Sequence, residues 1–165
     1  MAALNVGTVA PDFTLHSVGK ETISLSSILA KGPVVLAFFK VSCPVCQFAF
    51  PFLERVHQAS GGGRATVLGV SQDGGRDTQA FLRQLGVSFP VLLDEPRTYP
   101  VSNAYGITHV PTVFYIGANG EVEVSSVGWS KSDVETMNEK LAAHRKERPS
   151  ELWKSGEVVH DFQMG

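Results

Sequence analysis

The chain has 165 residues, of which 43% are hydrophobic and 18% charged, a composition typical of a globular protein and not of a disordered or fibrous one. Its 14 Lys and Arg side chains against 16 Asp and Glu give a net charge of −2, which argues against a basic surface for nucleic acid. No apolar run reaches the roughly 18 residues that span a membrane. We therefore expect one domain over 1–146, followed by a polar tail over 147–165.

The first half of the chain predicts a hairpin, a buried strand and a long helix. Val34–Phe39 is continuously apolar, which is typical of a central strand buried on both faces. Pro44 suits the first turn of the helix that follows, whereas Pro51 lies inside this helix and should kink it. The expected elements are a β-hairpin over 13–15 and 22–25 around Gly19, a helical turn over 26–30 capped by Ser26 or Ser27, a strand over 34–39 and a helix over 44–59.

The second half alternates strands with helices and then contains a second hairpin. Glycines at 61–63 end the long helix, and Asn119-Gly120 between two strand-like segments indicates a tight antiparallel turn. Strand–helix–strand units imply parallel pairing, so the pattern predicts an α/β fold with a mixed central sheet flanked by helices. The expected elements are strands over 65–70, 90–93, 112–116 and 121–127, and helices over 77–85, 101–105 and 132–145, the last capped by Ser130 or Ser132.

The tail over 147–165 differs in composition from the rest of the chain. It is polar and contains Pro149 and Gly156. We expect it to pack on the domain or on a partner through one small apolar group. This group consists of Leu152, Trp153, Val158, Val159 and Phe162.

Only two cysteines are present, Cys43 and Cys46, and they enclose Pro44 and Val45. Two cysteines cannot build a disulfide scaffold, and no second such pair completes a zinc site, so the pattern favours redox chemistry and predicts no metal. A helix start after a buried strand places Cys43 where backbone N–H groups and the helix dipole favour negative charge. We expect Cys43 to attack as the thiolate, and Cys46, one turn later, to resolve the mixed disulfide.

A second motif lies at the start of the strand over 112–116. Pro111 removes a hydrogen-bond donor there, so we expect it to serve another purpose. A cis Val110–Pro111 bond would expose the backbone N–H and C=O of Val110 to an extended substrate. An isolated proline is more often trans, and the combination with the two cysteines favours cis. We predict that Val110 and Pro111, together with Pro44 and Val45, contact the substrate.

With these motifs the chain resembles the TlpA/ResA-like branch of the thioredoxin-fold proteins, in the AhpC/TSA-redoxin superfamily. The resemblance covers about residues 6–143. It implies a thioredoxin-like fold with an N-terminal β-hairpin and an inserted βα element, a nucleophile at Cys43, a resolving thiol at Cys46 and a cis-proline at Pro111. The segments that carry it are 10–15, 35–51 around the cysteines, 86–94, 104–107 and 110–112.

Three positions depart from the pattern of this family. Ser42 stands where a Trp often precedes the first cysteine, and Ala37 and Ala49 stand where related proteins carry a buried Asp or a Glu. Proton transfer from Cys46 therefore needs water or another group. The candidates by their position near the motifs are Asp94, Glu54 and His109.

The chain has neither a dinucleotide-binding nor a phosphate-binding glycine pattern, so we expect no cofactor. Electrons would pass between a protein disulfide or dithiol and a second thiol partner, with no fixed oligomeric state indicated. Met1 is followed by no signal-type apolar run, which predicts a cytoplasmic protein if Met1 is the native start. If a signal segment was trimmed, a periplasmic or other extracytoplasmic location is expected instead.

Two alternatives to disulfide exchange stay open. A thiol peroxidase of the peroxiredoxin type needs Pro and Thr or Ser at fixed positions before its cysteine, and counting back from Cys43 gives Leu36 and Lys40 instead. A Cu(I)-binding chaperone of the same fold would use Cys43, Cys46 and His109, because thiolates suit this soft ion. The sequence favours a thiol–disulfide oxidoreductase over both.

Overall fold

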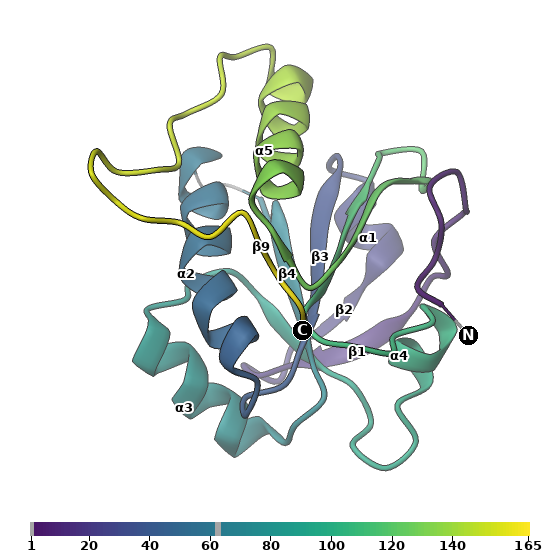
Figure 1. The fold of residues 1–165 in the computed structure, drawn as a ribbon. Helices are drawn as coiled ribbons and strands as arrows, with labels where there is room; N and C mark the ends of the chain where they lie inside the picture. Colours follow the sequence, from purple (N-terminus) through teal and green to yellow (C-terminus); the bar gives the residue numbers. More distant parts are fainter. Residues whose placement is uncertain (1, 62–63) are drawn as a thin grey trace.

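A computed structural model describes residues 2–61 and 64–165 as a central sheet with helices on both faces (Figure 1). The sheet has the strand order β2-β1-β5-β4-β3-β6-β7. Its strands are β1 (Thr14–Ser17), β2 (Thr22–Ser24), β3 (Val34–Phe39), β4 (Val67–Ser71), β5 (Val91–Leu93), β6 (Thr112–Ile116) and β7 (Val122–Val127), and a separate pair is formed by β8 (Trp129–Ser130) and β9 (Phe162–Gln163). The helices are α1 (Leu25–Leu29), α2 (Pro44–Ala59), α3 (Gly75–Leu85), α4 (Pro100–Ala104) and α5 (Lys131–Arg145).

The sheet mixes parallel and antiparallel pairing, as the order of its elements requires. Strands β3, β4 and β5 pair in parallel because α2 and α3 carry the chain back between them. The β1–β2 hairpin and the strands β6 and β7 pair antiparallel to their neighbours. The predicted α/β class with a mixed sheet is confirmed, and β5 and α4 follow one another in the chain before β6. Among the described residues, no helix is both long and apolar enough to cross a membrane.

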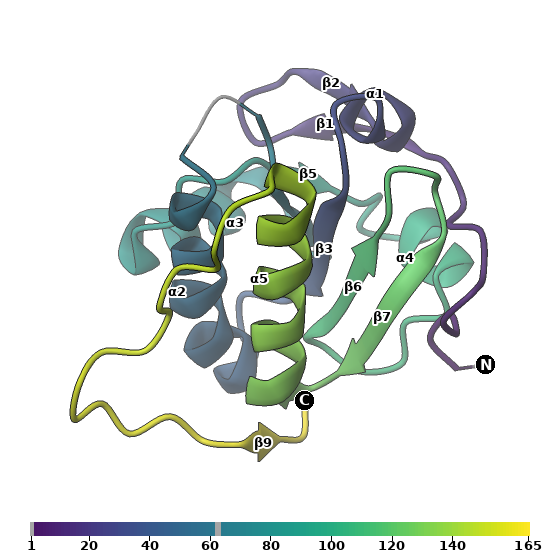
Figure 2. The ribbon, with the colours of Figure 1, turned by 90° about the horizontal axis from the view of Figure 1, so that it is seen from above.

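Strand β3 lies at the centre of the sheet and separates the core into two layers. All six of its residues are buried, which explains the continuous apolar run. Because side chains alternate across a strand, the odd-numbered residues of β3 pack with α2, α3 and α5, and the even-numbered residues pack with α1 and α4. Figure 2 shows α2, α3 and α5 on one side of β3 and α4 on the other.

Some element boundaries differ from the expected ones. The cap of α1 is Ser24, whose side chain accepts a hydrogen bond from the Ser27 N–H at 3.2 Å, because the later serines already lie inside the helix. Helix α3 begins at Gly75, which leaves Asp77 in its first turn, where a negative charge suits the helix dipole. Of the glycines at 61–63, residues 62 and 63 lie outside the described part of the chain.

Residues 147–165 leave α5, pass outside α2 and return to the start of α5 (Figures 1 and 2). Leu152 is only 5% exposed and joins the core between α2 and α5. Arg55 of α2 binds Glu157 with both guanidinium nitrogens at 2.7 Å, and Trp153 donates to Glu135 of α5 at 2.6 Å. The strand β9 in this segment was not expected from the sequence.

The hydroxyl of Tyr105 provides a test of the layer that contains α4. Tyr105 is fully buried and donates a hydrogen bond to the Pro11 carbonyl at 2.6 Å. We expect Tyr105→Phe to lower the free energy of unfolding by about 1–2 kcal/mol, because the Pro11 carbonyl loses its donor. Urea unfolding of both proteins measures this difference.

Tyr115→Phe is the matched control, since no described residue forms a hydrogen bond with the Tyr115 hydroxyl. It should change the free energy of unfolding by less than about 0.5 kcal/mol. Equal losses in the two variants would show that the bond to Pro11 contributes nothing specific.

Candidate active site

The loop between β3 and α2 places Cys43 at the start of α2. Cys43 is the N-cap of the helix in an extended conformation, and Pro44 occupies the first turn, where the helix requires no backbone N–H. The Cys43 Sγ accepts a hydrogen bond from the Cys46 N–H at 3.1 Å. The sulfur therefore performs the capping role of a serine or aspartate oxygen, at a point where backbone N–H groups stabilise negative charge.

A second loop, before β6, brings Val110 against Cys43. Strands β3 and β6 are antiparallel neighbours with Phe38 opposite Thr112, so the end of one lies beside the start of the other. The Val110–Pro111 bond is cis, which confirms the conformation expected from the motif. The Cys43 thiol donates to the Val110 carbonyl oxygen at 3.4 Å. Within the described part of the chain, the Val110 N–H donates no backbone hydrogen bond.

The two cysteines differ strongly in exposure. Cys43 is half-buried, whereas Cys46 has 0% exposed surface. Burial raises the pKa of the Cys46 thiol far above its ordinary value of 9.0, and the hydrogen bond with Cys43 and the negative charge of Asp73 act in the same direction. The site thus combines an accessible sulfur at a helix start with a buried, neutral thiol.

Asp73 was not among the candidates that the sequence indicated. Its carboxylate accepts a hydrogen bond from the Val41 N–H at 2.8 Å, next to the cysteine loop. Strands β3 and β4 are parallel, so the loops that follow them meet at one edge of the sheet. An acidic residue directly beyond the strand after the CxxC helix is the sequence signal that would have identified Asp73.

The three proton-transfer candidates from the sequence are placed differently from one another. Asp94 is fully buried and accepts hydrogen bonds from the N–H of Ser102 at 2.8 Å and of Val101 at 3.2 Å, so it is engaged at the start of α4. Glu54 accepts hydrogen bonds from the N–H and the hydroxyl of Ser88. His109 lines the same cavity as Cys43. Of these candidates, the structure brings only His109 close to the cysteine site.

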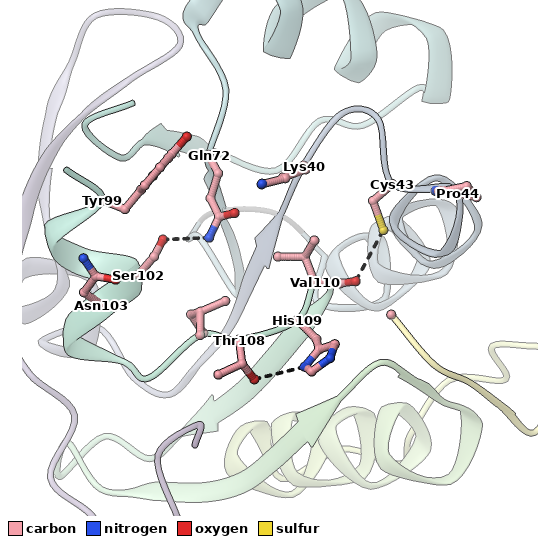
Figure 3. A pocket seen from close by; sticks show the side chains of 12 residues that line it. Lys40, Cys43, Pro44, Gln72, Tyr99, Ser102, Asn103, Thr108, His109 and Val110 are labelled. Atoms are coloured by element: carbon pink, nitrogen blue, oxygen red, sulfur yellow. Dashed lines mark hydrogen bonds between the residues drawn. The ribbon is translucent and has the colours of Figure 1, made fainter. Parts of the chain in front are cut away.

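An open cavity of about 500 Å³ lies between the cysteine loop, the Val110 loop and α4 (Figure 3). Pro44 and Val110 line it beside Cys43, whereas Val45 is absent from its lining and packs against the core. Pro111 is buried behind Val110. The other lining residues are Lys40, Gln72, Tyr99, Ser102, Asn103, Ile107, Thr108, His109 and Gly165. The cavity offers polar groups and one cation to a molecule that approaches Cys43.

The raised pKa of Cys46 makes the stability of the reduced protein depend on pH. Above pH 9.0 the unfolded chain loses this proton while the folded protein retains it. The contribution of the Cys46 thiol to the free energy of unfolding is therefore complete below pH 9. It declines as pH rises further, by at most about 1.4 kcal/mol per pH unit. Urea unfolding of the reduced protein at pH 8, 9 and 10 measures this decline.

Cys46→Ala is the reference for this experiment, because the lysines and tyrosines titrate in both proteins. We expect the difference in free energy of unfolding between wild type and variant to shrink above pH 9. Parallel pH profiles would show that the Cys46 thiol has no shifted pKa.

Comparisons with known proteins agree with this geometry. The family model described as the AhpC/TSA family matches residues 6–125. A thiol–disulfide oxidoreductase, ResA, of Geobacillus kaustophilus is 30% identical over 141 residues, which are 84% of this chain and 79% of the relative. A provisionally assigned peroxiredoxin, bcp, of Helicobacter pylori is 29% identical over 133 residues, or 74% of this chain and 88% of the relative.

Solved structures show the same fold. The thioredoxin domain of a thiol–disulfide oxidoreductase from Bacteroides vulgatus superposes with a TM-score of 0.74 at 21% identity, covering 84% of this chain and 98% of the other. A thiol:disulfide interchange protein of the thioredoxin family from Chlorobium tepidum gives 0.67 at 26% identity, covering 82% and 96%. The chain has a thioredoxin-like fold and belongs to the AhpC/TSA family.

Proposed function

We propose that this protein exchanges disulfides with protein thiol partners through Cys43 and Cys46. The observation that carries the proposal is the arrangement around one sulfur. Cys43 Sγ lies 3.1 Å from the Cys46 amide and 3.4 Å from the carbonyl of Val110, the residue before the cis-proline. The relatives named thiol–disulfide oxidoreductases support the same chemistry.

In the first step, the Cys43 thiolate attacks one sulfur of a partner disulfide. A new S–S bond joins Cys43 to the partner, the original S–S bond breaks, and the leaving sulfur departs as a thiolate that takes up a proton. The Cys46 N–H and the start of α2 stabilise the charge on Cys43 before the attack. The exposed side of Cys43 makes it the sulfur that meets the partner.

In the second step, Cys46 loses its proton and attacks Cys43 Sγ. The Cys43–Cys46 disulfide forms, the mixed disulfide breaks, and the partner leaves as a dithiol with two electrons gained. Burial opposes ionisation of Cys46, so this step needs a proton acceptor. We assign that role to Asp73, whose carboxylate accepts the Val41 N–H beside the cysteine loop, with water as the carrier. The same steps in reverse oxidise a partner dithiol.

Partner recognition would use the backbone of Val110. Its N–H donates no backbone hydrogen bond among the described residues, and an extended chain paired at this point would lie beside Cys43. Pro44 provides apolar contact on the other side of the sulfur. This assigns the substrate class as a protein or peptide disulfide, with electrons supplied or removed by a second thiol partner.

The matching peroxiredoxin keeps peroxide reduction as a second candidate. In that reaction Cys43 would be oxidised to a sulfenic acid by the peroxide, and Cys46 would then form the disulfide with loss of water. The positions at which peroxiredoxins carry Pro and Thr or Ser hold Leu36 and Lys40. The Cu(I) alternative stays a prediction, and no group of three or more His, Cys, Asp or Glu side chains within 2–61 and 64–165 is arranged to hold a metal ion.

Two serine variants test the proposed order of attack. Cys43→Ser should reduce the rate of reaction with a protein disulfide such as insulin to the uncatalysed background, because the attacking thiolate is gone. Cys46→Ser should form a stable mixed disulfide with the same substrate, because no resolving thiol remains. Mass spectrometry of alkylated samples measures both outcomes, and each variant is the matched control for the other.

A mixed disulfide trapped by Cys43→Ser and not by Cys46→Ser would reverse the two roles. Turnover of hydrogen peroxide without reaction with insulin would favour the peroxidase. Equilibration of wild type with glutathione then gives the direction of electron flow, since a potential near about −270 mV indicates a reductant and one near about −120 mV an oxidant.

A further inference from the structure

Residues 162–165 reach the loop that carries Val110. They form a second segment beside Cys43. Gly165 lines the same cavity as Cys43. A Cβ built on Gly165 would collide with the Val110 carbonyl and would stand 3.2 Å from the Pro111 nitrogen. The backbone of Gly165 therefore lies directly on the Val110–Pro111 unit, and in Figure 3 the yellow end of the ribbon comes up to this loop.

Hydrogen bonds of the residues just before 162–165 fix the path of this segment toward the Val110 loop. Strand β9 pairs antiparallel with β8, with Gln163 opposite Trp129. The Lys131 N–H donates to the Asp161 carbonyl at 2.9 Å, and the Trp129 indole N–H donates to the His160 carbonyl at 2.6 Å. Because Trp129 is 2% exposed and belongs to the core, these bonds attach the segment to a rigid part of the fold.

Gly128 lies where the segment crosses toward Val110. Its N–H donates to the Pro111 carbonyl at 2.8 Å, which joins the end of β7 to the cis-proline loop. Its φ of +81° favours glycine, and a Cβ there would stand 2.5 Å from the Gln163 carbonyl oxygen. Two glycines, Gly128 and Gly165, thus permit backbone-on-backbone packing at the site where a partner chain is expected to pair.

We propose that residues 162–165 occupy the protein-binding side of the groove beside Cys43 and thereby determine which disulfides reach it. This inference rests on the proposed function. A partner chain that pairs with Val110 must displace the segment, because both lie on the same backbone unit. A small disulfide would reach Cys43 through the cavity on the side of Tyr99 and Asn103, which Gly165 borders and does not fill.

Gly165→Val tests this inference in the full chain, because its side chain cannot fit against the Val110 carbonyl. We expect the rate of reaction with insulin to rise about three- to tenfold, as it would if the segment covers the groove roughly 70–90% of the time. The rate with cystamine, a small disulfide, should change less than twofold. Gly165→Ala should show a smaller increase, and Val158→Ala, at an 87% exposed position upstream of β9, should show none.

Hydrogen exchange of the Lys131 amide reports the position of the segment independently of any activity, since this amide donates to Asp161. We expect faster exchange in Gly165→Val. An unchanged insulin rate despite faster exchange, an equal increase for both disulfides, or exchange as slow as in wild type would each overturn the inference. A wild-type protein that reacts with neither disulfide would instead refute the proposed function, while the exchange data would still show whether Gly165→Val releases the segment.

Discussion

The hydrogen bond from the Cys46 amide to the Cys43 sulfur is the constraint on which the site depends. A helix start leaves backbone N–H groups without partners, and α2 satisfies one of them with a sulfur atom. The bond fixes the side chain of Cys43 at the end of α2 that faces the Val110 carbonyl. Helix capping and thiol chemistry are therefore the same interaction in this protein.

The sheet determines which loops meet at that sulfur. Strand β3 has β4 on one side and β6 on the other, so the cysteine loop lies between the loop with Asp73 and the loop with Val110. Because both faces of β3 are buried in apolar side chains, a shift of this strand would expose core residues. The positions of the reacting groups therefore follow from the packing of the core. This is why the site of a thiol–disulfide oxidoreductase can be assembled with few polar contacts.

Much of this arrangement could be predicted from local patterns, and the exceptions have physical reasons. The apolar run of β3, the proline after Cys43 and the proline before β6 each act over a few residues and indicated the strand, the helix start and the cis bond. Asp73 was missed although it directly follows the strand after the CxxC helix, because its contact with Val41 joins two loops that are 32 residues apart in the chain. The tail was expected to pack on the domain or on a partner, but strand β9 was missed because this short segment has no strand pattern and its pairing partner β8 is distant in the chain.

The buried carboxylate of Asp94 holds the α4 wall of the cavity independently of the elements that carry the two cysteines. It accepts hydrogen bonds from the N–H and the hydroxyl of Ser102, and the same hydroxyl receives a bond from Gln72 at 3.0 Å. The cavity wall made by α4 is thereby anchored to β5, outside the strand and helix that hold the cysteines. A substitution in this wall would therefore reshape the cavity on the side of Tyr99 and Asn103, while the hydrogen bonds of the Cys43 sulfur stay unchanged.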